Sequence, residues 1–315
     1  MDITIIICTY NRVGNLASCI GALGQQQDVD SLAWEVLVID NNSSDGTGEE
    51  VARLAQGFRV PVRCVRETEQ GLNYARNRGA LEATGHYCAY IDDDILVSPG
   101  WLHALYHALQ DNQAAAAGGR ILLDPDLDIP KWIKPEMYGF LGHQDFGDES
   151  FEMDGSERYP FGGNMAFLRD VLLTVGKFDV NMGRKGEGRK REELFKGEEL
   201  DYFQRVKRGE NAYIAYEPRA IVFHQVLPHQ LKKRYFRILH FNSGLQRALL
   251  GGPARGKTVL GVPLYLFPQL LRAGGRYLMQ AVTRGPDWAF RQQMTVANFV
   301  GMMIGHYRSR NRATA

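Results

Sequence analysis

Three consecutive carboxylates follow a short apolar segment in the first third of the sequence. Residues 87–91 have the aromatic and β-branched composition of a buried strand, and Asp92, Asp93 and Asp94 come directly after them. Three like charges at the tip of an apolar strand are costly unless a cation compensates them. Mg²⁺ and Mn²⁺ prefer oxygen ligands and often bridge one or two carboxylates to the phosphates of a substrate. This aspartate triplet therefore predicts a divalent-metal site; a solvated acidic turn before the helix that Pro99 opens is the alternative.

A second acidic group lies much further along the chain, where Gly197 precedes Glu198, Glu199 and Asp201. The segment has the pattern of a helix start. Acidic side chains are favourable in the first turn of any helix, because they face the positive end of its dipole. A functional role and this dipole effect therefore both stay open for the glutamate pair, Glu198 and Glu199.

Two smaller features could also serve a site. Gly162 and Gly163 are adjacent, and paired glycines let the backbone approach another group closely, although a tight bulge would need them too. His224 ends a strand-like segment, where a histidine either supports packing or binds a ligand.

The elements that must position these residues repeat in a simple order. Strand-like segments at residues 3–10, 34–40, 62–67 and 87–91 each end in polar residues, and helical segments follow, the first of them running to Gln26. This alternation favours a parallel sheet covered by helices. Ligands of such sheets bind at the carboxyl ends of the strands, so we expect the polar residues there to converge.

Later segments are less regular. Residues 124–160 show little periodicity and indicate an excursion over the sheet rather than a separate domain. Residues 183–197 are dense in Gly, Lys, Arg and Glu, which is typical of a mobile loop beside a site. Two short strands are expected around Pro218, at residues 213–216 and 220–224.

Composition indicates an ordinary globular protein of 315 residues, with 44% hydrophobic and 23% charged residues. Its four cysteines have no paired or metal-type spacing, which favours reduced thiols in a cytoplasmic protein. We expect no signal peptide, because the N-terminus lacks a basic leader, and no membrane span, because no apolar run is long enough.

Charge is distributed unevenly along the chain. The net formal charge is +1, yet the residues from Val226 onward contain 14 Lys and Arg against one acid, Asp287. Helix-compatible segments at residues 231–250 and 264–282, and an apolar one at residues 294–307, combine apolar residues with arginines. Such helices suit the surface of an anionic membrane on its cytoplasmic side. Packing on the catalytic region or on a second copy, giving a homo-oligomer, is the alternative, and no nucleic-acid recognition module is apparent.

Several blocks of the sequence resemble the family-2 glycosyltransferases, in the order found in that family. The blocks are Thr9-Tyr10-Asn11-Arg12, Val38-Ile39-Asp40-Asn41-Asn42-Ser43-Ser44-Asp45-Gly46-Thr47, Gly71-Leu72-Asn73-Tyr74-Ala75-Arg76-Asn77, Ile91-Asp92-Asp93-Asp94, Gly162-Gly163-Asn164-Met165-Ala166-Phe167, Gly197-Glu198-Glu199-Leu200-Asp201 and Pro218-Arg219-Ala220-Ile221-Val222-Phe223-His224. The resemblance implies a GT-A fold, which is an α/β fold with a Rossmann-like, mostly parallel sheet. It also implies inverting transfer of a sugar from a nucleotide-sugar donor.

The same resemblance implies roles for individual residues. Those expected to contact the nucleotide or the donor sugar are Thr9, Tyr10, Arg12, Asp40, Asn42, Arg76, Asp92, Asp93, Gly163 and Asn164. Those expected to bind Mn²⁺ or Mg²⁺ are Asp94, Asp92 and His224. The family's catalytic base lies in a Glu-Asp pair that here reads Glu198-Glu199, so Glu199 is the first candidate, with Glu198 and Asp201 as alternatives.

The sequence therefore predicts a GT-A catalytic domain over residues 1–225 and a basic helical region over residues 226–315. It predicts a metal-dependent inverting glycosyltransferase, acting from a UDP-sugar on a glycan or lipid-linked acceptor of bacterial polysaccharide or glycolipid biosynthesis, at the inner face of the cell membrane. A sugar-nucleotidyltransferase and a non-catalytic membrane scaffold are the rival functions. The first would need a Gly-rich, Arg- or Lys-bearing N-terminal loop for a triphosphate, and residues 9–14 offer only Arg12.

Overall fold

The computed structural model describes residues 1–209, 212–251 and 256–313. The chain divides into two compact units, each discontinuous in sequence. Unit 1 comprises Met1–Leu127, Leu141–Glu187 and Lys196–Val226, and unit 2 comprises Asp128–Phe140, Gly188–Phe195 and Leu227–Ala315. Two segments that precede residue 225 thus belong with the C-terminal helices.

Strands and helices alternate along the first part of unit 1. The strands are β1 (Ile3–Thr9), β2 (Trp34–Asp40), β3 (Val62–Arg66), β4 (Tyr87–Asp92), β5 (Ile95–Val97), β6 (Ala116–Leu123), β7 (Phe151–Glu152), β8 (Met165–Leu168) and β9 (Ile214–His224). The helices are α1 (Val13–Gly24), α2 (Thr47–Ala55), α3 (Leu72–Glu82), α4 (Trp101–Asp111), α5 (Arg169–Thr174) and α6 (Glu198–Lys207).

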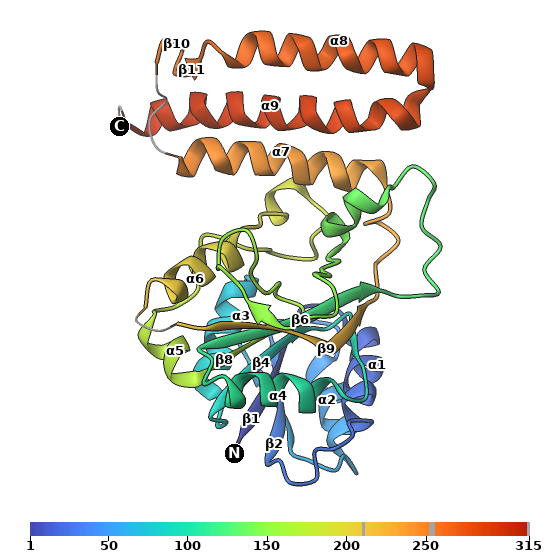
Figure 1. The fold of residues 1–315 in the computed structure, drawn as a ribbon, viewed down its shortest axis with the longest axis vertical. Coiled ribbons are helices and arrows are strands. Elements are labelled where there is room, and N and C mark those ends of the chain that lie inside the picture. The colour runs from blue at the N-terminus through green and yellow to red at the C-terminus, as the bar shows by residue number, and fades with distance from the viewer. Residues whose placement is uncertain (210–211, 252–255, 314–315) are drawn as a thin grey trace. The chain divides into compact units, whose positions relative to one another are not determined.

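The sheet of unit 1 has the strand order β3-β2-β1-β4-β8-β6-β9-β5, with β7 paired to β9 (Figure 1). Its first four strands are parallel, as the repeated strand–helix order predicts. Beyond β4 the sheet is mixed, because β8 runs antiparallel to both of its neighbours while β6 and β9 are parallel to each other. The sheet is therefore less uniformly parallel than its N-terminal half alone suggests.

The apolar character of β1 follows from burial on both faces of the sheet. Ile3, Ile5 and Ile7 belong to the core that also contains residues of α1, α2 and α4. Ile6 and Cys8 belong to the core that contains residues of α3, α5 and α6. Alternate side chains of a strand point to opposite faces, so a strand between two helical layers has no polar alternation. All four cysteines are free thiols.

The C-terminal part of the sheet differs from the sequence prediction. The two strands expected around Pro218 are a single strand, β9, which continues to His224. The pairing of β9 with β6 shifts register between Gly119 and Arg120, so the irregularity expected at Pro218 is absorbed within one strand. An irregularity of this kind lets a strand bend without ending, which residue composition alone does not reveal.

Unit 2 is built on helices α7 (Lys233–Leu250), α8 (Leu266–Arg284) and α9 (Pro286–Ala313), with the short strands β10 (Thr258–Val259) and β11 (Val262–Pro263). The 3₁₀ helix η2 (Arg191–Glu193) belongs to this unit, and η1 (Pro135–Leu141) lies almost entirely in it. Trp132 packs edge-on against Phe236 and Phe290, which fixes the segment before η1 to α7 and α9.

Helix α9 lies between α7 and α8 within unit 2 (Figure 1). The α7–α9 pair is very close: a Cβ on Gly244 would lie 2.0 Å from the Asn298 carbonyl oxygen, and one on Gly301 would lie 2.0 Å from that of Phe241. Small residues at such positions let two helix backbones approach each other. Among the described residues, no helix combines the length and the apolar character that crossing a membrane requires.

Candidate functional site

The carboxyl ends of three neighbouring strands meet at one edge of the sheet in unit 1. The register pairs Thr9 of β1 with Asp40 of β2, and Cys8 of β1 with Asp92 of β4. Asp93 and Asp94 continue from β4 into the turn before β5. The convergence expected from the strand–helix alternation is therefore present.

Asp93 is buried and held by two residues that follow or end β1. Thr9 Oγ1 donates a hydrogen bond to Asp93 Oδ2 at 2.7 Å, and Arg12 Nη1 donates to Asp93 Oδ1 at 2.9 Å. Burial raises the pKa of Asp93 to about 6, against the opposing effect of Arg12. Thr9 and Arg12 were expected to contact the nucleotide. In this structure the Thr9 hydroxyl and the Arg12 guanidinium donate hydrogen bonds to Asp93.

Asp94 lies between two cationic partners. Its Oδ2 accepts a hydrogen bond from Arg12 Nη1 at 3.0 Å, and its Oδ1 lies 3.3 Å from His224 Nε2. Burial acts to raise the pKa of Asp94, but the charges of His224 and Arg12 outweigh it and hold the pKa below its usual value. Asp94 is consequently ionised, although Oδ1 accepts no hydrogen bond and is fully buried.

His224 is the ion-pair partner of Asp94 in this structure. Its Nδ1 donates to the Leu141 carbonyl oxygen at 2.6 Å, and its Nε2 faces Asp94. Burial acts to lower the pKa of His224, but the Asp94 charge raises it above its usual value. A protonated imidazole has no lone pair for a metal. The predicted metal-ligand role therefore requires His224 to lose its proton. In this structure the imidazole is the ion-pair partner of Asp94.

Asp92 is the least constrained member of the triplet. It is partly exposed, and its carboxylate makes no hydrogen bond to the described part of the chain. Burial and the Asp94 charge raise its pKa, whereas Arg76 and Arg184 act in the opposite direction. Arg184 also helps to lower the pKa of Asp94. Residues 183–197 were predicted to form a loop beside a site, but the effect of Arg184 on the aspartate triplet was not predicted. Nothing local to the loop indicates which charge Arg184 approaches.

The predicted three-residue metal group is not assembled. Within the described ranges, no cluster of three or more His, Cys, Asp or Glu side chains is arranged to hold a metal ion. The residues fit a site with fewer protein ligands: Asp92 offers a carboxylate without a hydrogen bond to the described chain, and Asp94 offers Oδ1, whose neighbour at 3.3 Å is His224 Nε2. Mg²⁺ and Mn²⁺ sites often take only one or two carboxylates and complete their coordination with water and phosphate.

The glutamate pair opens helix α6 and shares one buried cation. Arg76 Nη1 lies 3.3 Å from Glu198 Oε1, and Arg76 Nη2 lies 3.1 Å from Glu199 Oε1. Arg76 is 2% exposed, so both carboxylates depend on it for charge compensation. The guanidinium of Arg76 is turned to the glutamates, and its expected place on the donor side stays a prediction.

The two glutamates differ in their environments. Burial and the neighbouring Glu199 charge raise the pKa of Glu198 to about 7. Burial also acts to raise the pKa of Glu199, but Arg76 more than offsets it and the pKa is lowered. The Glu199 side chain is 19% exposed, against 5% for Glu198. At neutral pH, Glu199 is thus the ionised and more accessible carboxylate.

The adjacent glycines connect the two acidic groups. A Cβ on Gly162 would lie 2.0 Å from Arg76 Nη2 and 2.6 Å from Glu199 Oε1. A Cβ on Gly163 would lie 3.6 Å from Asp92 Oδ2. One short backbone segment therefore contacts the Arg76–glutamate cluster on one residue and the aspartate triplet on the next. The triplet and the glutamate pair lie in one region of unit 1.

Asn164, expected to border the donor sugar, makes three side-chain hydrogen bonds. Its Oδ1 accepts a hydrogen bond from Trp101 Nε1 at 2.9 Å, and its Nδ2 donates to the carbonyl oxygens of Ala220 and Arg120 at 2.8 and 3.1 Å. The residue is completely buried. Its side chain thus links α4 to β6 and β9, and its contact with a donor sugar stays a prediction.

Asp201, the alternative base, forms a salt bridge of 3.0 Å with Arg205 one helical turn away. The Asp201 side chain is 42% exposed and lies outside the Arg76 cluster. This pairing along the surface of α6 makes it the weaker candidate among the three acids.

The loop after β2 is organised by residues that the sequence analysis only partly identified. Asp40 Oδ1 accepts a hydrogen bond from the Ser43 backbone at 2.8 Å, and Asn42, with φ of 67°, accepts one from Arg66 at 2.7 Å. The buried Asn41 accepts from the Gly71 backbone at 2.8 Å and so joins this loop to the start of α3. Tyr10, the remaining nucleotide candidate, follows β1 directly and is partly exposed.

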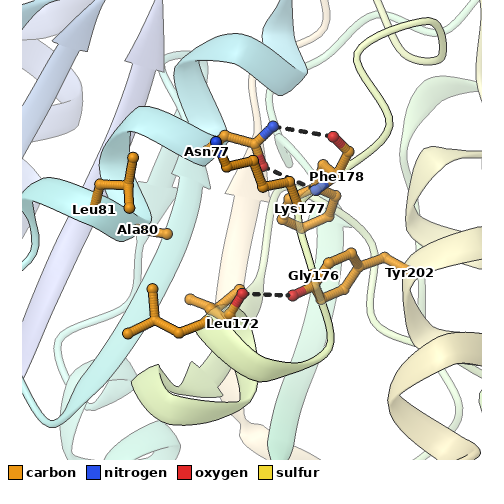
Figure 2. A pocket seen from close by; sticks show the side chains of 9 residues that line it. Asn77, Ala80, Leu81, Leu172, Gly176, Lys177, Phe178 and Tyr202 are labelled. Atoms are coloured by element: carbon orange, nitrogen blue, oxygen red, sulfur yellow. Dashed lines mark hydrogen bonds between the residues drawn. The ribbon is translucent and has the colours of Figure 1, made fainter.

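Helix α3 also positions the segment that delivers Arg184. Asn77 exchanges two hydrogen bonds with the Phe178 backbone, as Figure 2 shows, and Asn73 Nδ2 donates to the Asp179 carbonyl oxygen at 2.7 Å. The pocket in Figure 2 has a volume of about 130 Å³ and is lined mainly by α3, α5 and the segment after α5. It contains none of the predicted site residues.

Comparison with known proteins gives this geometry a context. Residues 4–176 match the sequence model of glycosyl transferase family 2. Over 197 residues the chain is 32% identical to the glucosyl-dolichyl phosphate glucuronosyltransferase of Haloferax volcanii, an alignment that covers 59% of each protein. The match thus spans about three fifths of that relative's length.

Two solved structures share the fold. The mannosyltransferase PcManGT of Pyrobaculum calidifontis, in complex with GDP-Man and Mn²⁺, has a TM-score of 0.59 and 17% identity over 97% of this chain and 86% of its own. GalNAc-T7 with UDP, GalNAc and Mn²⁺ has a TM-score of 0.54 and 16% identity over 80% of this chain and 50% of its own. At these identities the likeness concerns the fold, and it confirms the predicted GT-A architecture with a helical C-terminal region.

Proposed function

Because this chain belongs to glycosyl transferase family 2, we propose that it transfers a sugar from a nucleotide-sugar donor to an acceptor hydroxyl with inversion at the anomeric carbon. One observation carries the proposal: Gly162 and Gly163 bring the Arg76–glutamate cluster and the aspartate triplet together in unit 1. A base and a site for a leaving diphosphate are the two requirements of such a displacement.

The proposed step is a single displacement. Glu199 accepts the proton of the acceptor hydroxyl, the hydroxyl oxygen bonds to the anomeric carbon, and the bond from that carbon to the diphosphate breaks on the opposite face. The lowered pKa of Glu199 keeps it ionised and able to accept the proton. Arg76 acts as a positioning residue that directs Glu199, and Glu198 supports Arg76 from the other side.

Asp92 and Asp94 are the residues that would hold Mn²⁺ or Mg²⁺. A divalent cation would neutralise the charge that develops on the leaving diphosphate. The adjacent Asp92 carboxylate, which has no hydrogen bond to the described chain, supports this assignment, as does the presence of Mn²⁺ in structures that share the fold. Arg184 would add positive charge on the same side, since its charge already acts on both aspartates.

For the donor we propose a UDP-sugar, with Asp40 and Asn42 at the base and Thr9, Tyr10 and Arg12 around the nucleotide. Related structures contain UDP or GDP-Man, which supports a nucleotide-sugar but favours neither base. The rival nucleotidyltransferase is disfavoured because it would need a Gly-rich loop with several Arg or Lys to hold a triphosphate, and residues 9–14 offer only Arg12.

For the acceptor we propose a glycan or lipid-linked sugar. The name of the Haloferax volcanii relative points to a lipid phosphate carrying a sugar. The basic C-terminal region supports an anionic membrane surface as a partner and a location on the inner face of the cell membrane. A homo-oligomer through unit 2 stays the alternative use of that region.

Replacing the proposed base tests the reaction. Glu199→Gln should lower the rate of sugar transfer, or of donor hydrolysis where no acceptor is known, by about 10²–10⁴-fold. Asp201→Asn on the same helix is the matched control and should change the rate only slightly, because Asp201 pairs with Arg205 at the surface. A panel of nucleotide-sugars provides the assay. Equal rates for Glu199→Gln and the unmodified protein would exclude the base assignment, and a biological role that survives the substitution would favour the scaffold.

Calorimetry of nucleotide binding tests the metal assignment. UDP binding should need Mn²⁺ or Mg²⁺, and Asp94→Asn should weaken it by about tenfold or more, since removing a ligand or its support typically costs that much affinity. Asp145→Asn, at a surface carboxylate paired with Arg120, is the control. Metal-independent binding, or an unchanged affinity in Asp94→Asn, would contradict the assignment.

A further inference from the structure

The outer surface of helix α8 carries a continuous apolar stripe that no part of the described chain covers. Phe267, Leu271, Leu278 and Val282 follow one another at spacings of four, seven and four residues, which places them on one face of the helix. They are 38%, 77%, 64% and 87% exposed. We call these four residues the α8 stripe. Large apolar side chains in such an array normally lie against a partner.

The opposite face of α8 already has its partner. Leu266 and Ala273 are the buried residues of this helix, and they lie seven residues apart, away from the α8 stripe. Within unit 2 the helix packs on α9, which in turn packs on α7. The α8 stripe is thus additional to the apolar face that folding requires.

The other two long helices of unit 2 do not offer such a surface. Close contacts at Gly244 and Gly301 join α7 and α9, and Phe236, Leu239 and Phe290 are buried. The exposed large apolar residues of these two helices, Leu250, Trp288 and Tyr307, lie near helix ends and form no stripe. The apolar stretch at residues 294–307, predicted as a candidate membrane contact, therefore packs largely inside unit 2. Among the helices described here, the unpartnered apolar surface is concentrated on α8.

Basic residues border the α8 stripe. Arg272 and Arg276, one turn apart and both exposed, lie between the α8 stripe and the buried face of the helix, and Arg284, on the other side of the stripe, ends the helix. The sequence contains no Asp or Glu between Lys257 and Pro286. Asp287, which follows, already pairs with Lys233 at 2.5 Å. An apolar stripe beside an acid-free basic stripe is complementary to an anionic, partly apolar surface.

Aromatic residues mark both ends of the helix. Tyr265, immediately before α8, is 50% exposed, and Trp288, just after it, is 56% exposed with the Arg284 guanidinium 5.5 Å above its ring. Tyrosine and tryptophan are enriched at the boundary between lipid headgroups and acyl chains. The β10–β11 turn ahead of Tyr265 adds two exposed apolar residues, Val259 and Leu260, at 50% and 62%.

We propose that α8 lies flat in the headgroup region of an anionic lipid bilayer, with the α8 stripe facing the acyl chains and Arg272 and Arg276 contacting lipid phosphates. Arginines along its length are consistent with a helix that lies in the interface rather than one that spans the bilayer. The inference deepens the proposed action on a lipid-linked acceptor and rests on it for its biological purpose. Lipid binding itself needs neither donor nor acceptor.

Vesicle flotation of the full chain tests the proposal, using phosphatidylglycerol–phosphatidylcholine vesicles and vesicles of phosphatidylcholine alone. The unmodified protein should float with the anionic vesicles. The double variant Leu271→Glu/Leu278→Glu should bind at least about tenfold more weakly, because acidic side chains would enter an apolar and anionic layer. The matched control is Leu81→Glu/Leu173→Glu, which changes two comparably exposed leucines in unit 1 and should leave binding unchanged.

A second variant separates the apolar contribution from the ionic one. Arg272→Gln/Arg276→Gln should lower binding to anionic vesicles by about fivefold for each arginine and should reduce its sensitivity to salt. Donor hydrolysis by all variants should stay at the level of the unmodified protein, which separates this proposal from the proposed reaction. Circular dichroism checks that each variant is folded.

Two results would overturn the proposal. One is vesicle binding by Leu271→Glu/Leu278→Glu equal to that of the control. The other is a dimer of the unmodified protein, seen by light scattering without lipid, that becomes a monomer in this variant while vesicle binding persists; the α8 stripe would then be an interface between two copies.

Discussion

The aspartate triplet and the glutamate pair both bury several carboxylates in unit 1, but they compensate the charge differently. Asp93 and Asp94 share Arg12, and Asp94 also faces His224. Glu198 and Glu199 share the guanidinium of Arg76, and the Lys196 charge also acts on Glu199. The triplet leaves the Asp92 carboxylate without a hydrogen bond to the described chain, so a further cation would be favourable beside Asp92. In the glutamate pair, Glu199 is both paired with Arg76 and more exposed than Glu198, which suits a group that exchanges a proton.

Arg76 should therefore be the more critical of the arginines on α3. Arg76→Met removes the ion-pair partner of the buried Glu198 and of the partly exposed Glu199, and it should lower the free energy of unfolding by about 3–5 kcal/mol. Arg78→Met is the matched control on the same helix: Arg78 pairs with Glu82 at the surface, so the loss should stay within about 1 kcal/mol. Denaturant unfolding measures both. Similar losses in the two variants would show that Arg76 is not the main compensating charge.

The raised pKa of Glu198 gives a distinct pH dependence. Burial and Glu199 shift this pKa from 4.5 to about 7, so between these values the folded protein binds more protons than the unfolded chain. Stability from this group must then fall as pH rises, by up to about 1.4 kcal/mol per pH unit. Glu198→Gln should remove this slope, so its stability relative to the unmodified protein should increase from about pH 5 to pH 7. Parallel curves for the two proteins would argue that Glu198 titrates normally.

Gly162 should tolerate a side chain less well than Gly163. A Cβ at Gly162 would lie 2.0 Å from Arg76 Nη2, and Arg76 cannot move without separating from its glutamates. Gly162→Ala should lower stability by about 1–3 kcal/mol. In Gly163→Ala the new Cβ meets Ile95 Cδ1 at 3.3 Å, which a small shift relieves, so thermal unfolding should change less. The reverse order would mean that the glycines serve the triplet more than the glutamate pair.

Much of unit 1 was predictable from local patterns. The strands β1, β2 and β4 and the polar residues after them follow from largely apolar segments that end in Thr9, Asp40 and Asp92, whereas β3 combines Val and Cys with Arg. Parallel strands align their carboxyl ends, so Thr9, Asp40 and Asp92 had to lie at one edge. The later sheet was less accessible: β8 is antiparallel, and β9 passes through Pro218. Such pairings depend on residues distant in sequence, which local composition does not encode.

The candidate site shows the same division. The sequence identified both acidic groups, but it did not predict that Arg76 pairs with Glu199 or that Asn164 accepts a hydrogen bond from Trp101. It also did not predict that Arg184 approaches the triplet. Which residue a side chain contacts depends on how elements distant in sequence pack together when the chain folds.

The sequence by itself determined the two acidic groups, the parallel strands that present one of them, and the separation of a basic helical region from an acidic body. These depend on residue types and on the periods of strands and helices. Only the tertiary structure decided that Arg76 joins Glu198 and Glu199, and that α7 and α9 bury their apolar faces while α8 keeps one exposed. A periodic pattern shows that a face is apolar, but what covers that face depends on which neighbour packs against it.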